Sequence, residues 1–320
     1  MEFKGIAGHE RQKDILSILV KKGRLPHALL FSGPRGIGKR LIAFELLRNI
    51  FCEKRNACGM CHACRSLTAG THPDLVTVAG ESSIKIDELR SVRKEVHQPP
   101  FEAPLRGILI DNAELMTREA GNALLKTLEE PPPSNLFILV TGEEQAIPLT
   151  VRSRCMRLCF GPLNTTALRT YFETSCGIGD KKSALFSSIA AGSIATGLFW
   201  INEGNFELRR PIAEVVTGKK KSFTAATSVA EQITRGGRET QYLSFLLSFF
   251  RDIWWCSHSG DITGIINQDL ADIIQTNNWD GSDRVQGCLA RIYEAAKTMR
   301  YNVNRWLAIE NLMIDLMVRA

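Results

Sequence analysis

Short apolar runs alternate with amphipathic stretches along the first half of the chain. The runs at 27–33 (HALLFSG), 106–115 (RGILIDNAEL) and 135–142 (NLFILVTG) are typical of strands that are buried on both faces. Apolar residues at helical spacing lie between them at 39–51 and 117–130, and a proline run stops the second of these helices. This alternation predicts an α/β fold with a parallel sheet.

The pattern changes near residue 160. From there, helical patterns rich in alanine, serine and leucine replace the strand pattern, and long periodic segments occupy 240–255 and 304–320. The segment 204–211 (GNFELRRP) carries the breaks that are typical of a linker. We therefore predict an α/β domain followed by two helical domains, over 1–160, 161–204 and 205–320.

Composition and charge change this picture little. The chain has 320 residues, of which 44% are hydrophobic and 23% charged, as is typical of a soluble globular protein. No apolar run approaches the roughly 18 residues of a membrane span, and the first residues lack the apolar stretch of a secretory signal, so we expect a cytoplasmic protein without membrane contact. The net charge of +6 permits contact with nucleic acid without requiring it.

The segment after the first predicted strand nearly matches a phosphate-binding loop. Residues 33–40 read GPRGIGKR, where the motif is G-x-x-x-x-G-K-[ST]. A strand, a glycine-rich turn and a helix in this order let backbone N–H groups surround a phosphate, and the lysine adds positive charge. The last position normally gives Mg²⁺ a hydroxyl ligand, but a guanidinium has no lone pair to give. The candidate nucleotide-binding residues of this degenerate loop are Gly33, Gly36, Gly38, Lys39 and Arg40.

Polar residues at the ends of the next two predicted strands are candidates for the same site. The second buried run ends in Asp111, and Glu114 lies three residues on. This acidic pattern holds Mg²⁺ and polarises water in P-loop hydrolases. Thr141 ends the third run and is a candidate sensor of the terminal phosphate. Apolar runs that end in an acid are common, so the position downstream of the loop gives the pattern its weight.

Four of the nine cysteines lie within thirteen residues. Two overlapping C-x-x-C pairs suit a tetrahedral Zn²⁺, and four thiolates fill its coordination sphere, which favours a structural metal over a catalytic one. The alternative is four free thiols, which would be prone to oxidation at this spacing. The expected ligands are Cys52, Cys58, Cys61 and Cys64. The other five cysteines lie in apolar contexts, and we expect them to be buried.

Two arginines follow in the segment VRSRC (151–155), namely Arg152 and Arg154. Arginines in a loop are normally exposed to solvent. A planar, permanently charged guanidinium is also the group that stabilises a transferring phosphoryl group. The spacing alone leaves both interpretations open.

Taken in order, several of these motifs resemble the AAA+ subunits of the bacterial clamp loader. The resemblance runs from about residue 5 to residue 160 and rests on RLPHALLFSGPRGIGK, the four cysteines, THPDL, IKIDELR, NALLKTLEEPP and SRC. NVNRWLAIENLMIDL near the C-terminus resembles the collar helix of that family, whereas 161–300 match only in general character. The resemblance implies an AAA+ P-loop domain with a zinc knuckle, a helical lid domain and a helical collar domain that mediates oligomerisation, over 1–160, 161–204 and 205–320.

Within this family, the chain departs from the ATP-hydrolysing tau/gamma subunits. Arg40 replaces the hydroxyl residue, and Ala195 in GSIATGL stands where those subunits place a second-sensor arginine. THPDL and IKIDELR are closer to the delta prime subunits. The resemblance therefore implies a subunit with little or no ATP hydrolysis of its own.

The resemblance also implies a role for Arg154 and a set of partners. Arg154 would act as an arginine finger in the ATP site of a neighbouring tau/gamma subunit, with Arg152 as the weaker candidate. The partners would be the tau/gamma and delta subunits, the sliding clamp, and primed DNA through the assembled ring. The alternatives are an active tau/gamma-like or other AAA+ ATPase, ATP binding without hydrolysis, and a zinc-dependent DNA-binding module. The cysteine segment lacks the basic and aromatic run that grips single strands.

Overall fold

A computed structural model describes residues 1–80, 83–276, 282–299, 301 and 303–319. The chain forms two compact units, of which the first comprises 1–168 with 192–194 and the second comprises 169–191 with 195–320. The first unit is α/β and the second is helical, so the predicted fold class is confirmed.

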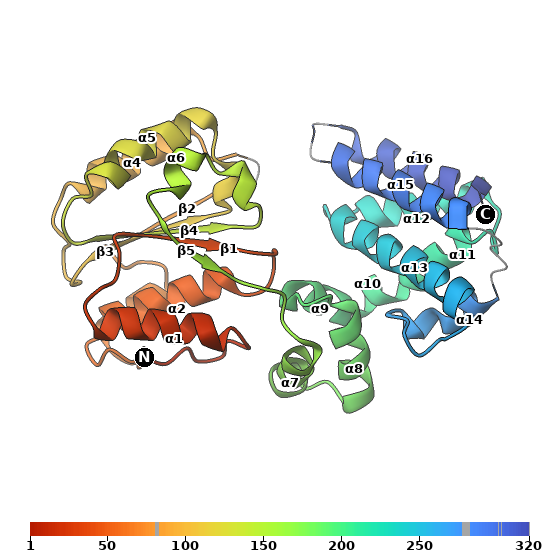
Figure 1. The fold of residues 1–320 in the computed structure, drawn as a ribbon, viewed down its shortest axis with the longest axis horizontal. Helices are drawn as coiled ribbons and strands as arrows, with labels where there is room; N and C mark the ends of the chain where they lie inside the picture. Colours follow the sequence, from red (N-terminus) through yellow and green to blue (C-terminus); the bar gives the residue numbers. More distant parts are fainter. Residues whose placement is uncertain (81–82, 277–281, 300, 302, 320) are drawn as a thin grey trace. The chain divides into compact units, whose positions relative to one another are not determined.

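A parallel sheet of five strands forms the centre of the first unit (Figure 1). Its strands are β1 (Ala28–Ser32), β2 (Leu75–Ala79), β3 (Arg106–Asp111), β4 (Asn135–Thr141) and β5 (Met156–Cys159). The strand order is β2-β3-β4-β1-β5. Because all five strands run in one direction, the residues that follow β1, β3 and β4 meet at the carboxyl edge of the sheet, where Ser32 stands beside Thr141.

Helices cover both faces of this sheet. They are α1 (Glu10–Lys21), α2 (Lys39–Phe51), α3 (His62–Thr68), α4 (Ile86–Val96), α5 (Arg118–Glu129) and α6 (Leu149–Arg152), with the short 3-10 helices η1 (Ala113–Leu115) and η2 (Glu144–Ala146). α1 and α2 lie on one face, and α4, α5 and α6 lie on the other (Figure 1). Leu29 and Phe31 of β1 pack into the first layer, while Leu30 packs into the second. Burial on both faces explains the unbroken apolar run of β1.

The helix predicted over 117–130 is α5. Thr117 caps its start by accepting the N–H of Ala120 at 3.2 Å, and the chain leaves helical geometry at Glu130, before the proline run. Gly121 faces Pro148, whose Cγ lies 3.3 Å from the position that a Cβ would take. This close approach fixes α5 against the start of α6.

Every element from residue 165 onward is helical among the described residues. The α-helices are α7 (Thr165–Cys176), α8 (Asp180–Ile189), α9 (Ile194–Ile201), α10 (Glu203–Glu207), α11 (Arg209–Val216), α12 (Phe223–Thr234), α13 (Glu239–Ser259), α14 (Ala271–Gln275), α15 (Ser282–Thr298) and α16 (Arg305–Arg319), with the 3-10 helix η3 (Gln268–Leu270). α12 packs against α16, and α13 packs against α15. The helices predicted over 240–255 and 304–320 are found as α13 and α16, with Ala320 outside the described residues. No helix in the described part of the chain has the length and apolarity of a membrane span.

The linker predicted over 204–211 is wrong, because this segment is helical and partly buried. Arg209 is only 1% exposed, and its guanidinium pairs with Asp269 at 2.9 Å and lies 4.4 Å from the ring centre of Phe245. Pro211 occupies the first turn of α11, where a missing N–H costs little. The adjacent arginines and the proline suggested an exposed break, but one of the arginines is buried as part of an ion pair.

Candidate functional site

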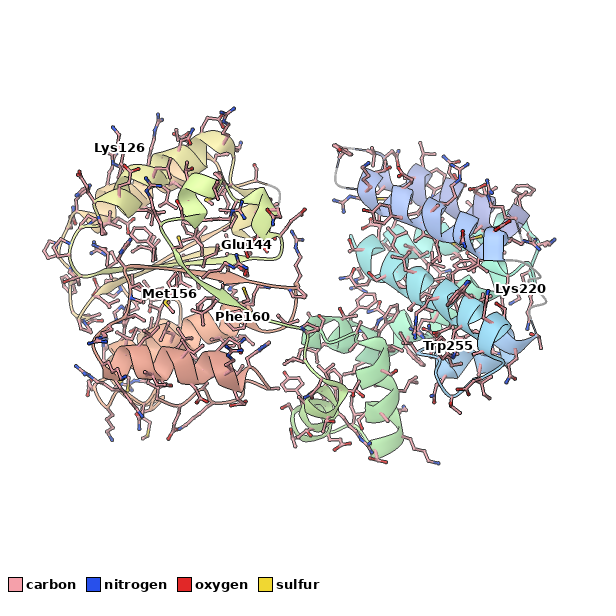
Figure 2. All side chains as sticks on the ribbon, in the orientation of Figure 1. Lys126, Glu144, Met156, Phe160, Lys220 and Trp255 are labelled. Atoms are coloured by element: carbon pink, nitrogen blue, oxygen red, sulfur yellow. The ribbon has the colours of Figure 1, made fainter. Side chains whose placement is uncertain are left out.

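The degenerate phosphate loop lies between β1 and α2, at the carboxyl edge of the sheet. Gly33 has φ 149° and passes close to the chain after β5, where an added Cβ would stand 2.1 Å from the carbonyl oxygen of Phe160 (labelled in Figure 2). Gly38 has φ 99° at the N-cap of α2, and Gly36 has φ 75°. These conformations strain any residue that carries a Cβ. The loop therefore keeps the geometry of its motif.

Lys39 points back into this loop. It is only 5% exposed, and its Nζ donates to the carbonyl oxygens of Gly33 at 2.7 Å and Pro34 at 2.5 Å. Burial lowers its pKa to about 8, although the carboxylates of Glu114 and Asp111 oppose the shift. An ammonium group carries three donors, so one remains beyond these two bonds.

Two guanidinium groups occupy the acidic end of β3. Arg40 Nη1 lies 3.4 Å from Asp111 Oδ2, and Arg35 Nη2 donates to Glu114 Oε1 at 2.9 Å. The Glu114 side chain is only 4% exposed and also accepts the N–H of Gly142 at 3.1 Å. Asp111 and Glu114, the two acids that the sequence suggests for holding Mg²⁺ and polarising water, are thus both paired with arginine. Sequence reasoning missed Arg35, because the motif leaves its position unconstrained.

Thr141 ends β4 beside Ser32 of β1, as the register of the two strands requires. It is 1% exposed, and its Oγ1 accepts the N–H of Glu143 at 3.0 Å. The hydroxyl is therefore used by the turn that follows β4. The structure brings the predicted loop, acids and threonine to one edge of the sheet, and their roles toward a nucleotide stay predictions.

The four clustered cysteines form a single site between α2 and α3. Their sulfur atoms all lie within 4.8 Å of one another, with Cys52 and Cys64 buried. Burial tends to raise the pKa of Cys52, but backbone N–H groups at Cys58, Asn56 and Lys54 outweigh it and lower the pKa to about 6. Burial raises the pKa of Cys64 to about 12. Four thiol ligands within this distance can hold a metal ion, and zinc stays a prediction.

The THPDL motif has a structural role that sequence reasoning did not identify. Asp74 is fully buried and accepts the backbone N–H groups of Phe101 at 2.6 Å, Glu102 at 2.9 Å and Ala103 at 2.9 Å. Burial tends to raise its pKa, but these three bonds outweigh it and lower the pKa. The Nε2 of His72 lies 3.2 Å from Glu102 Oε1. The motif therefore ties the loop after α4 to the chain that leaves the cysteine cluster.

Comparisons with known proteins agree with this architecture. Residues 8–164 match a family model described as DNA polymerase III, delta subunit. The DNA polymerase III subunit tau of Escherichia coli is 35% identical over 174 residues, which are 53% of this chain and 27% of that protein. The chain is a relative of the AAA+ clamp-loader subunits. The subunit tau of Bacillus subtilis is 36% identical over 169 residues, which are 52% of this chain and 30% of that protein.

A solved structure shares the fold of this clamp-loader relative over nearly its whole length. The DNA polymerase III gamma subunit-related protein of Thermotoga maritima has a TM-score of 0.53 and 18% identity, covering 96% of this chain and 98% of that one. At this identity the likeness shows the fold alone. The two tau subunits are matched over less than a third of their own length. The activity and partners of the relatives therefore come to this chain only as proposals.

The two arginines of the VRSRC segment (151–155) have different surroundings. Arg152 ends α6, and its Nη1 lies 3.7 Å from Glu144 Oε1. Glu144, labelled in Figure 2, also pairs with Arg157 at 3.0 Å. The Arg154 side chain is 34% exposed and pairs with Glu129 at the end of α5. Arg152 is thus held by η2, and Arg154 by α5.

Contrary to the expectation of burial, three of the remaining five cysteines are half-buried (Cys155, Cys176 and Cys256), and one, Cys159, is exposed. It ends the edge strand β5 with an exposed side chain, and Arg157 Nε donates to its sulfur at 3.3 Å. The bonds from Arg157 and Ser32 lower the pKa of this thiol. Cys288 is buried as expected, and burial raises the pKa of its thiol to about 11. Side chains alternate along a strand, so an apolar context did not ensure burial at the sheet edge.

Proposed function

We propose that the chain is the delta prime subunit of a DNA polymerase III clamp loader, which helps to load the sliding clamp onto primed DNA with little or no ATP hydrolysis of its own. The tau subunits that it resembles and the family model over 8–164 support the family. The state of its own phosphate loop supports the choice of a non-hydrolysing member.

The observation that carries the proposal is the pairing of both candidate acids with arginine. A hydrolytic P-loop site binds Mg²⁺ through a hydroxyl next to the loop lysine and an acid at the end of a neighbouring strand. Here Arg40 stands at the hydroxyl position and contacts that acid, Asp111. A metal ion would have to displace a cation and then sit beside it. Glu114, the candidate for orienting water, is engaged by Arg35 and Gly142.

The formed loop also supports a second candidate, which is ATP binding without hydrolysis. Lys39 keeps one donor beyond its two carbonyl partners, and the loop glycines keep the conformations of a phosphate-binding turn. Arg35 and Arg40 add two positive charges, and guanidinium groups bind phosphate oxygens well. Binding of ATP in the presence of EDTA distinguishes this candidate from a loop that is purely structural.

The chemistry of the proposed subunit lies at Arg154. We place it as an arginine finger that enters the ATP site of a neighbouring tau/gamma subunit in the assembled ring. Its side chain is partly exposed after α6, in the SRC segment through which the resemblance was drawn. The helical domain predicted over 205–320 would bind the tau/gamma and delta subunits, and the four cysteines would hold a structural Zn²⁺.

The experiment is the substitution of Arg154 by alanine in a reconstituted loader. Because an arginine finger stabilises the charge of the transition state, its loss should lower the ATPase that is stimulated by clamp and primed DNA, by about 10³-fold at a site that depends fully on it. The steady-state ATPase of the complex measures this, with assembly checked by size-exclusion chromatography. Arg157→Ala, which removes a nearby exposed arginine, is the matched control. An unchanged rate with Arg154→Ala contradicts the assigned role.

A further inference from the structure

The Arg154 guanidinium is hydrogen-bonded through both of its Nη atoms and still reaches solvent. Its Nη1 donates to the carbonyl oxygen of Thr150 at 2.8 Å and to Ser153 Oγ at 3.3 Å. Its Nη2 donates to Glu129 Oε1 at 2.5 Å. The side chain remains 34% exposed. Three acceptors from two separate segments therefore orient the guanidinium without covering it.

Glu129 reaches Arg154 through the packing of α5 on α6. It is the last residue of α5, and it lies 25 residues before Arg154 in the chain. The close approach of Gly121 and Pro148 fixes this helix against the start of α6. The carboxylate is thus presented from a helix that packs into the core of the sheet, and the proline run just after it ends that helix.

The ion pair between Glu129 and Arg154 can orient the guanidinium, but it is too weak to keep Arg154 from binding a phosphate. The side chains of Glu129 and Arg154 are 48% and 34% exposed, and ion pairs this open to water attract only weakly. A carboxylate on one Nη group also leaves other donors of the guanidinium for a phosphate oxygen. The arginine side chain is otherwise flexible, and ordering it in advance reduces the entropy that it loses on meeting a ligand.

We propose that Glu129 is a positioning residue, which presents Arg154 to the phosphate oxygens of a nucleotide held by a neighbouring subunit. This inference rests on the proposed arginine finger. It also distinguishes the two arginines of the VRSRC segment, because Arg152 is held instead by Glu144 of η2. Glu129 acts only through Arg154 and has no contact with the nucleotide itself.

The test uses the whole 320-residue chain assembled with its tau/gamma and delta partners, the sliding clamp and primed DNA. The steady-state ATPase is measured over a range of ATP concentrations. Glu129→Ala should lower kcat on the order of tenfold with KM unchanged. A misplacement of 1 Å in a reacting group costs about a hundredfold, and a partial loss of orientation should cost less. Glu129→Asp should restore part of the rate. Glu130→Ala removes the next carboxylate along the chain and should leave kcat unchanged, which makes it the matched control.

A double variant separates positioning from a general structural effect. If Glu129 acts through Arg154, Glu129→Ala combined with Arg154→Ala is no slower than Arg154→Ala alone. A further loss in the double variant overturns the inference. An unchanged or raised kcat for Glu129→Ala also overturns the inference if Arg154→Ala lowers kcat. In that case the proposed role of Arg154 as an arginine finger still holds. An unchanged kcat for Arg154→Ala overturns the finger and the positioning role together.

Discussion

Asp74 illustrates how a single buried carboxylate organises a segment of the first unit. It is fully buried, and three consecutive backbone N–H groups donate to it. An asparagine amide at this position would direct N–H groups at donors and would leave some of them without an acceptor. We expect Asp74→Asn to reduce the free energy of unfolding by about 3 kcal/mol, because hydrogen bonds to charged groups are strong and buried unsatisfied groups are costly. Urea unfolding measures this, with the exposed Asp87→Asn on α4 as the control.

The contribution of Asp74 also depends on pH. Its pKa in the folded chain is lowered, so it lies below the value of about 3.9 for an unfolded aspartate. The ionised carboxylate therefore stabilises the fold fully above the unfolded-state pKa, and the contribution is lost as the pH falls through the folded-state pKa. The difference between wild type and Asp74→Asn should shrink as the pH falls below about 4. A difference that stays constant over this range contradicts the assigned role of the carboxylate.

Arg35 and Arg40 give a prediction of gained function. Arg35→Ala with Arg40→Ser removes the two guanidinium groups from Glu114 and Asp111 and restores the hydroxyl of the P-loop motif. Because the acid at the end of β3 is then free for Mg²⁺, the affinity for Mg²⁺-ATP should rise by at least about tenfold, or 1.4 kcal/mol. Titration with a fluorescent ATP analogue, with Mg²⁺ and with EDTA, measures it. If the wild type and the double variant bind Mg²⁺-ATP with equal affinity, Arg35 and Arg40 do not exclude the metal.

Residue chemistry could be read from the sequence where a motif fixes the position. Lys39, Arg40 and Asp111 came from such motifs, and the structure places them at one edge of the sheet. The pairing of Arg35 with Glu114 could not be predicted, because it joins a variable loop position to a residue far along the chain. The role of Asp74 could not be predicted either, because its partners are backbone N–H groups of residues far along the chain, which the identity of a side chain does not indicate.

The four cysteines link the end of α2 to the start of α3. Cys52 is the C-cap of α2, and Cys61 is the N-cap of α3, where its sulfur accepts the N–H of Cys64. A bound metal would therefore stabilise both helix ends. We expect one Zn²⁺ per chain, and its removal by a chelator should increase hydrogen exchange in 52–68 more than in the sheet. Metal analysis and exchange mass spectrometry test this. The absence of metal from a chain purified under reducing conditions, together with the same exchange rates in 52–68 before and after treatment with chelator, would contradict a structural metal at these cysteines.

The central elements were predictable, and the edges of the sheet were not. β1, β3 and β4 are buried on both faces and appear as apolar runs in the sequence. β2 and β5 lie at the two edges of the sheet, and several of their side chains are exposed or half-buried. Their sequences, LVTVA and MRLC, are short and mixed, so hydrophobic patterning did not reveal them.

The two units differ in how far their structures could be predicted from the sequence. The first unit carries most of the motifs and the family match, so both its fold and its resemblance were accessible. The second unit could be predicted as helical, but its internal packing could not. The buried Arg209, which joins α11 to Asp269 of η3, contradicts the simple expectation that arginine is exposed. Such ion pairs depend on long-range contacts that local patterns do not contain.

We propose that this chain keeps the architecture of an AAA+ nucleotide domain and does not hydrolyse ATP. The most direct measurement is the rate of ATP hydrolysis by the purified 320-residue chain with Mg²⁺, compared with the same protein in EDTA. We expect no Mg²⁺-dependent turnover, because Arg40 and Arg35 pair with the acids that a hydrolytic site needs. Mg²⁺-dependent turnover near the rate of about 1 s⁻¹ or above that is typical of enzymes would contradict this proposal.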